Sequence, residues 1–299
     1  MTLGYDKDLF ILAFDQRDSF QKVFFGVQGD PTPEETARMI DAKQLIFEGA
    51  LKAFESVTAG VAILVDEQFG ADVARDAKTR GITVAMPVEK SGRSEFDFEY
   101  GEDAFQAHIE AMDPDFVKPL ARYNPEGDGA MNGRQTARLK TLSDRLHADG
   151  RKLLFELLVP PEAHQLAAVG GDTARYDGQI RPALMRSAIA ELQQSGVEPD
   201  IWKIEGLDTR EDCEALAAQC RIGGRDAVAC VVLGRGADDA AVDHWLKMGA
   251  GVPGFVGFAI GRSIWGEPLK AFLAGGKPRE DAAGEIAANY RRFVDVYRG

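Results

Sequence analysis

The chain has 299 residues, of which 45% are hydrophobic, and it carries a formal net charge of −13 at pH 7. This length and hydrophobic content suffice for a large buried core. The excess of acidic residues argues against a general nucleic-acid binder or a ligand of anionic membranes, because phosphate-rich surfaces attract basic proteins.

Signals for membranes, metals and cofactors are missing from the sequence. No run of about 18 apolar residues occurs, so no transmembrane helix is expected. The first eight residues are polar and have the pattern of neither a signal peptide nor a transit peptide, so we expect a cytoplasmic protein. Cys213, Cys220 and Cys230 form no Cys-x-x-Cys pair and the four histidines are scattered, which predicts no metal site and no cofactor.

Eight short apolar runs alternate with longer amphipathic segments along the chain. The runs span residues 9–14, 61–65, 82–86, 116–120, 153–159, 201–204, 227–233 and 254–260. Helical patterns occupy residues 33–54, 133–147, 180–195, 210–220 and 281–297. Thr32 is a candidate N-cap for the first helix, with Pro33 at its first position.

Eight strand–helix repeats predict an α/β fold, a (β/α)₈ TIM barrel, in a single domain that covers residues 1–299. An open doubly wound sheet is the alternative. Against it, the first run is followed by Asp15-Gln16-Arg17, where a dinucleotide-binding sheet has Gly-x-Gly-x-x-Gly.

Three charged residues, Lys118, Glu156 and Lys203, lie inside the apolar runs. An unpaired buried ammonium is costly. Lys203 is therefore expected either to act as a neutral Schiff-base nucleophile or to pair with Glu205 or a neighbouring carboxylate. Alternate residues of barrel strands face the interior, so the three side chains should converge there. We expect the two lysines to lower each other's pKa by repulsion and burial; a structural Lys–Glu–Lys ion network is the alternative.

Two glycine–arginine turns, Gly234-Arg235-Gly236 and Gly261-Arg262-Ser263, follow the last two runs. In barrels, the loops at these positions often bind phosphate. Glycine lets backbone N–H groups approach the phosphate, and an arginine fork matches its oxygens. Ordinary turns with exposed arginines are the alternative. Further basic residues near strand ends, either solvated or in contact with a substrate, are Arg17, Lys90 and Arg122.

These residues together resemble the class I ketose-phosphate aldolases of the tagatose-bisphosphate aldolase type. The closer resemblance is to the 2-deoxy-5-keto-gluconate 6-phosphate aldolase domain of inositol catabolism, and it runs over nearly the whole chain. The segments that carry it are residues 14–20, 88–92, 96–101, 122–128 and 232–238, together with Lys118, Glu156, Lys203 and the run from Gly261 to Trp265.

The resemblance implies roles for individual residues. Lys203 is the Schiff-base lysine, Glu156 transfers protons, Lys118 is its electrostatic partner, and Asp15 orients substrate hydroxyls or Lys203. Gln16 stands on the substrate side without a defined role. The residues implied to bind the substrate or its phosphate are Gly234, Arg235, Gly261, Arg262, Arg17, Gln16, Lys90 and Arg122.

The implied activity is the metal-independent cleavage of 2-deoxy-5-keto-gluconate 6-phosphate into dihydroxyacetone phosphate and malonate semialdehyde. A class I aldolase acting on another ketose phosphate, such as tagatose or fructose bisphosphate or a sulfo-sugar phosphate, is the first alternative. A phosphosugar-binding sensor without catalysis is the second. The expected partners are a phosphorylated keto-sugar or keto-acid and further copies of the chain, with no nucleic acid and no membrane.

Overall fold

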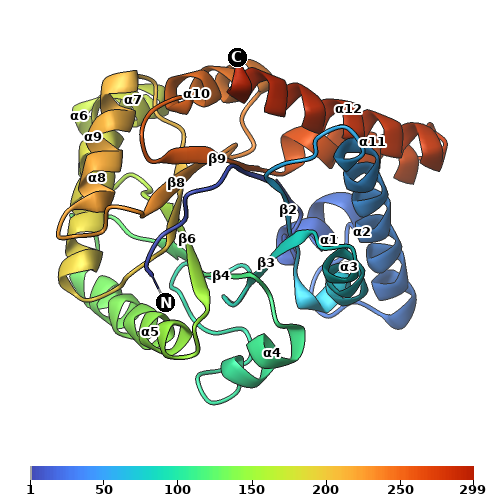
Figure 1. The fold of residues 1–299 in the computed structure, drawn as a ribbon, viewed down its shortest axis with the longest axis horizontal. Helices are drawn as coiled ribbons and strands as arrows, with labels where there is room; N and C mark the ends of the chain where they lie inside the picture. Colours follow the sequence, from blue (N-terminus) through green and yellow to red (C-terminus); the bar gives the residue numbers. More distant parts are fainter. Residues whose placement is uncertain (1) are drawn as a thin grey trace.

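The computed structural model describes residues 2–299, which form a closed barrel of parallel strands inside a ring of helices (Figure 1). The strands are β1 (Leu9–Ala13), β2 (Val61–Leu64), β3 (Thr83–Pro87), β4 (Phe116–Lys118), β5 (Leu120–Arg122), β6 (Lys152–Leu158), β7 (Ile201–Glu205), β8 (Ala229–Leu233) and β9 (Phe255–Ile260). Strands that follow one another in the chain pair with each other, except β4 and β5, which both pair with β6; β1 also pairs with β9. The predicted TIM barrel is confirmed.

The fourth predicted run, residues 116–120, is not a single strand. It is divided into β4 and β5 at Pro119, which has no N–H to give to a ladder. The Pro119 carbonyl still accepts a hydrogen bond from the Glu156 N–H at 2.9 Å. β4 and β5 therefore share one position in the barrel wall between β3 and β6. We call each such position a stave, and the barrel has eight staves.

The surrounding helices are α1 (Asp18–Phe25), α2 (Pro33–Phe54), α3 (Glu67–Thr79), α4 (Phe105–Met112), α5 (Gly129–Ala148), α6 (Ala163–Ala168), α7 (Thr173–Gln179), α8 (Arg181–Gln194), α9 (Arg210–Arg221), α10 (Asp239–Gly249), α11 (Arg262–Leu273) and α12 (Arg279–Arg298). α2 has the predicted bounds, and Thr32 and Glu35 form a reciprocal capping box at its start. α5 begins four residues before the expected Gly133, because the Asp128 carboxylate caps the N–H groups of Ala130 and Met131.

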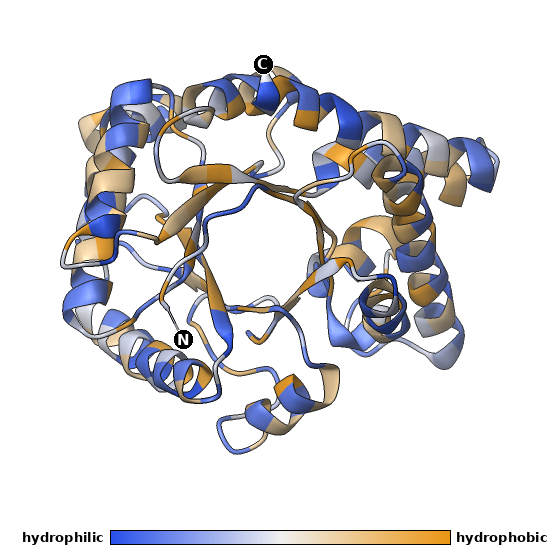
Figure 2. Cartoon of the chain, viewed as in Figure 1, coloured by the Kyte–Doolittle hydropathy of each residue, from blue (hydrophilic) through white to orange (hydrophobic). Residues whose placement is uncertain are grey.

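Apolar side chains of the barrel form two layers, the inner one inside the barrel and the outer one between the strands and the helices. In Figure 2 the strands are mostly orange, whereas the helices carry both orange and blue residues. The inner layer contains Leu9, Ile11, Ala13, Phe116, Leu154 and Ile201, among others. Because strand side chains alternate with period two, the next inward position on four staves falls to a polar residue. These residues are Asp15, Lys118, Glu156 and Lys203.

The amino-terminal end of the barrel is crossed by the first residues of the chain (Figure 1). The Gly4 N–H donates to Asp200 Oδ1 at 2.9 Å, and the Tyr5 N–H donates to the Ala227 carbonyl at 2.8 Å. Tyr5 packs edge-on against Phe116 of the inner layer. The polar inner residues therefore lie at the opposite, carboxyl end of the strands. Within residues 2–299, no helix has the length and apolar character needed to cross a membrane.

Candidate active site

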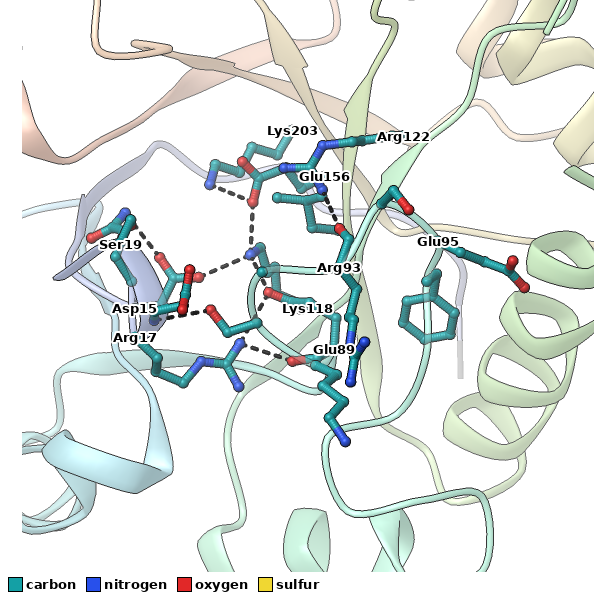
Figure 3. A pocket seen from close by; sticks show the side chains of 18 residues that line it. Asp15, Arg17, Ser19, Glu89, Arg93, Glu95, Lys118, Arg122, Glu156 and Lys203 are labelled. Atoms are coloured by element: carbon teal, nitrogen blue, oxygen red, sulfur yellow. Dashed lines mark hydrogen bonds and ion pairs between the residues drawn. The ribbon is translucent and has the colours of Figure 1, made fainter. Parts of the chain in front are cut away.

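A cavity of about 310 Å³ opens at the carboxyl ends of the strands, where active sites of barrel enzymes lie. Figure 3 shows its side chains, which come from the segments after β1 and β3 and from the staves β4/β5, β6 and β7. The lining residues that carry charge are Asp15, Arg17, Asp18, Glu89, Lys90, Arg93, Glu95, Lys118, Arg122, Glu156 and Lys203.

Lys118 is the centre of the polar cluster at the bottom of this cavity. Its ammonium nitrogen lies 2.8 Å from a carboxylate oxygen of each of Asp15, Glu89 and Glu156. The side chain is only 2% exposed. Such a buried charge is tolerated because it is fully paired.

The pKa values in the cluster follow from burial and from these contacts. Burial opposes the charge on Lys118, but the Asp15, Glu156 and Glu89 carboxylates outweigh it and raise the Lys118 pKa well above its ordinary value. The expectation that the two lysines lower each other's pKa is thus wrong for Lys118, because carboxylates surround it. Burial also opposes ionisation of Asp15 and Glu156, yet the attraction of Lys118 and Lys203 prevails and lowers the pKa of both carboxyls.

Lys203 lies beside this cluster and has a different environment. Its ammonium nitrogen is 2.8 Å from Glu156 Oε2, the same oxygen that contacts Lys118. β6 and β7 pair with Glu156 opposite Lys203, so the barrel register sets this contact. The Glu205 side chain, which the sequence offered as an alternative partner for Lys203, instead contacts Arg181 and Arg235.

A third buried lysine, Lys43, which the sequence analysis did not single out, holds the segment that carries Asp15. Lys43 of α2 is 0% exposed, pairs with Asp66 at 2.6 Å and donates to the carbonyls of Phe14 and Gln16. Asp66 in turn caps α3 through the Phe69 N–H. The backbone on both sides of Asp15 is therefore fixed from α2 and α3.

Glu89 is a further cavity residue that the sequence analysis did not assign. It contacts Lys118 and Arg17, and its Oε2 atom is buried without a hydrogen-bond partner among residues 2–299. Burial outweighs the nearby cations and raises the Glu89 pKa. Its position could have indicated this role: Glu89 lies two residues beyond the end of β3, where the alternation of side chains along the strand predicts an inward-facing residue. Arg17 is buried and pairs with Glu89 and, at 2.7 Å, with Glu99. These contacts fix the position of the Glu89 carboxylate.

The two glycine–arginine turns do not line the cavity. Arg235 contacts Asp177 at 2.6 Å and Glu205 at 3.1 Å, and its backbone adopts a φ of 53°. Arg262 is exposed at the start of α11, near Gly236. Gly261 lies so close to the Ala13 carbonyl that a Cβ atom would come within 2.4 Å of it, so this glycine has a packing role against β1. Gly234 is buried at the end of β8.

The remaining predicted substrate-side residues, Gln16, Lys90 and Arg122, do line the cavity. The Gln16 amide donates to Asp15 Oδ1 at 3.4 Å. Arg122 donates to the Arg93 carbonyl at 2.8 Å, and Arg93 is a lining residue that the sequence analysis missed. Nothing in its local pattern separates it from an ordinary loop arginine.

This arrangement combines a buried carboxylate, that of Glu156, between two ammonium groups with a polar cavity above them. Within the described residues, no group of three His, Cys, Asp or Glu side chains has the arrangement of a metal site. The chemistry that these residues can perform themselves is amine addition to a carbonyl and proton transfer through Glu156.

Comparison with solved structures gives several barrels of the same fold. An archaeal fructose-1,6-bisphosphate aldolase, with its catalytic lysine covalently bound to the carbinolamine intermediate of its substrate, matches at a TM-score of 0.56 and 12% identity. The match covers 98% of this chain and 94% of that one. A fructose-bisphosphate aldolase from Slackia heliotrinireducens matches at 0.59 and 14% identity, over 94% and 86% of the two chains. At these identities the likeness establishes the fold alone.

Comparison at the sequence level gives one family. No curated protein matches the chain. A family model described as "Uncharacterized protein conserved in bacteria (DUF2090)" matches residues 4–299. The chain therefore belongs to the DUF2090 family, with nearly its whole length inside the match.

Proposed function

We propose that the chain is a class I aldolase, which cleaves a carbon–carbon bond of a phosphorylated keto-sugar or keto-acid through a Schiff base on Lys203. The observation that carries the proposal is the placement of Lys203 at the bottom of the carboxyl-end cavity, 2.8 Å from Glu156 Oε2, with Lys118 on the same oxygen. The fold shared with Schiff-base-forming aldolases is consistent with it.

The contacts of the two lysines support Lys203 as the nucleophile. Three carboxylates hold the Lys118 ammonium and raise its pKa, so its amine is not released for attack. Among residues 2–299, Lys203 has one ion-pair partner, Glu156. Loss of a proton from Lys203 therefore disturbs fewer contacts, and Lys118 keeps Glu156 in place when the Lys203 charge is gone.

The proposed steps balance without an added reagent. The neutral Lys203 amine adds to the substrate ketone, and water leaves to give an iminium, which acts as an electron sink. Glu156, directly or through water, takes the proton of the β-hydroxyl group. The bond between the α- and β-carbons breaks, an aldehyde leaves, and the electron pair forms an enamine on Lys203. Protonation of the enamine and addition of water free the ketone product and the amine.

For the substrate we propose 2-deoxy-5-keto-gluconate 6-phosphate, with dihydroxyacetone phosphate and malonate semialdehyde as products. The support is the resemblance over the segments 14–20, 88–92, 96–101, 122–128 and 232–238. A ketose bisphosphate or a sulfo-sugar phosphate is the alternative within the same chemistry. Assaying the cleavage of each of these compounds decides between them.

Borohydride trapping with dihydroxyacetone phosphate tests the class of reaction. We expect a reduced covalent adduct on Lys203, located by peptide mass spectrometry, and no adduct at that position in Lys203→Met. Lys152→Met is the matched control, since Lys152 lies on β6 at the amino-terminal end of the barrel, where it contacts Gly4 and Asp200. It should be trapped as the wild type is.

Three outcomes separate the alternatives. An adduct on Lys118 would keep the chemistry and reverse the roles of the two lysines. Binding of dihydroxyacetone phosphate without any adduct would exclude the Schiff-base mechanism and favour a sensor. An adduct on Lys203, followed by turnover of only one candidate substrate, would identify that substrate.

A further inference from the structure

The charge of the cavity is distributed unevenly between its bottom and its rim. At the bottom, the cations of Lys118, Lys203 and Arg17 pair with the carboxylates of Asp15, Glu89 and Glu156, and Arg17 also pairs with Glu99, so all three cations are paired. The rim carries three further basic residues, which we call the rim cations: Lys90 and Arg93 from the loop after β3, and Arg122 at the end of β5.

The acidic residues near the rim cations are already neutralised by others. Asp18 pairs with Lys22 at 2.8 Å, and Glu95 pairs with Arg134 and Arg138, each at 2.8 Å. Within residues 2–299, no ion pair involves Lys90, Arg93 or Arg122. The rim therefore offers uncompensated positive charge in a protein whose net charge is −13.

Several contacts hold the loop that carries two of these cations. Gly92 has a φ of 73°, and the Asp18 carboxylate lies 3.1 Å from where its Cβ would be. The Ser91 N–H donates to Glu99 Oε2 at 3.2 Å, and the Ser91 hydroxyl accepts from the Asp18 N–H at 3.2 Å. Arg122 donates to the Arg93 carbonyl. A preorganised loop lowers the entropy lost when a ligand binds.

The rim also has a defined position relative to the turns of the last two strands. In the order of the eight staves, β3 and β4/β5 lie across the barrel from β8 and β9. The rim cations therefore face the site from the side opposite Gly234-Arg235-Gly236 and Gly261-Arg262. If the phosphate of the ketone half lies toward these turns, the aldehyde half of a substrate joined to Lys203 extends toward the rim cations.

We infer that the rim cations bind an oxyanion at the end of the aldehyde half of the substrate. This inference rests on the proposed function, and it assigns the second anionic group that each proposed substrate carries to Lys90, Arg93 and Arg122. Carboxylate, phosphate and sulfonate share the required chemistry, because guanidinium and ammonium groups bind each of them through charged hydrogen bonds.

The test compares aldehydes that differ in their terminal charge. Condensation with dihydroxyacetone phosphate is measured for malonate semialdehyde, for glyceraldehyde 3-phosphate and for uncharged glyceraldehyde. In the double variant Lys90→Met/Arg93→Met, the ratio of kcat/KM for the better anionic aldehyde to that for glyceraldehyde should fall by about 10- to 100-fold. Arg75→Met is the matched control: Arg75 is an exposed α3 residue that pairs with Asp72, and its loss should leave the ratio unchanged.

The outcomes keep the two proposals apart. An unchanged ratio in the double variant overturns the inference, while trapping on Lys203 in the same variant shows that the proposed function still stands. The anionic aldehyde whose rate falls more identifies the anion as carboxylate or phosphate. If trapping on Lys203 fails, the proposed function fails, and calorimetric titration with malonate and with inorganic phosphate still tests the rim. Binding that is at least 10-fold weaker in the double variant supports it, and equal binding overturns it.

Discussion

At the scale of single residues, one oxygen atom joins the two lysines of the site. Glu156 Oε2 lies 2.8 Å from both ammonium nitrogens, and its pKa is lowered because the two cations outweigh its burial. The carboxylate is therefore the resting form and is available to take a proton. Its position on β6, beside Lys203 on β7, keeps donor and acceptor at hydrogen-bond distance.

The variant Glu156→Gln tests this assignment. It keeps the size of the side chain and removes the ability to accept a proton. We expect kcat for cleavage to fall by about 10²- to 10⁴-fold, while borohydride still traps dihydroxyacetone phosphate on Lys203. Glu102→Gln, at an exposed loop position, is the control and should retain full activity. Retention of kcat in Glu156→Gln would remove Glu156 from the proton transfer.

At the scale of elements, the alternation of apolar runs with amphipathic segments was enough to find the barrel, and the charges inside the runs were enough to find the bottom of its cavity. Strands buried on both faces appear as apolar runs, so Lys118, Glu156 and Lys203 stood out as charges inside them. The split at Pro119 had a local signal, the proline itself. The pairing of Arg235 with Asp177 and Glu205 had none, because these partners lie 58 and 30 residues away in the chain. Which loop cations stay free for a ligand depends on such distant pairs.

The contact between β1 and β9, which closes the barrel, depends on a glycine. Gly257 of β9 pairs with Leu9, and a Cβ atom built on it would lie 2.0 Å from the Leu9 carbonyl oxygen. The pairing of β8 with β9 also shifts its register next to Gly257. Any side chain here must push the two strands apart.

Gly257→Ala should therefore lower the free energy of unfolding by roughly 3 kcal/mol or more, since backbone atoms cannot move aside as a side chain can. Gly284→Ala is the matched control. Gly284 lies inside α12, has no positive φ, and has nothing within 4 Å of the place that a Cβ atom would take, so alanine should stabilise by about 0.5–1 kcal/mol. Urea unfolding of both variants measures the difference, and equal effects would contradict the role assigned to the strand contact.

At the scale of the whole molecule, the site is also a cross-link of the barrel. Lys118 on β4 joins Asp15 after β1, Glu89 after β3 and Glu156 on β6, so its three contacts connect staves around the ring.

The folded state lowers the pKa of Asp15 and Glu156. Their contribution to stability is present above their unfolded pKa values and is lost as the pH falls through the folded ones. Lys118 has a raised pKa, so its contribution is present below its unfolded pKa and is lost only as the pH rises through the folded one. Between about pH 5 and pH 9 all three contributions are present.

Lys118→Met should therefore change how stability depends on pH. At pH 8 the variant leaves buried carboxylates without their main partner, which costs about 3–5 kcal/mol. Burial then dominates their pKa values and raises them, as it already raises that of Glu89. As the pH falls toward 5, these carboxylates take up protons in the folded variant, and the deficit relative to wild type narrows by up to about 1.4 kcal/mol per pH unit for each proton bound. Urea unfolding at pH 5, 6, 7 and 8 measures this slope.

Lys140→Met, which removes an exposed pair with Asp144, is the control and should lower the free energy of unfolding by less than about 1 kcal/mol at every pH. A deficit for Lys118→Met that stays constant from pH 8 to pH 5 would show that its ammonium does not hold the carboxylates ionised.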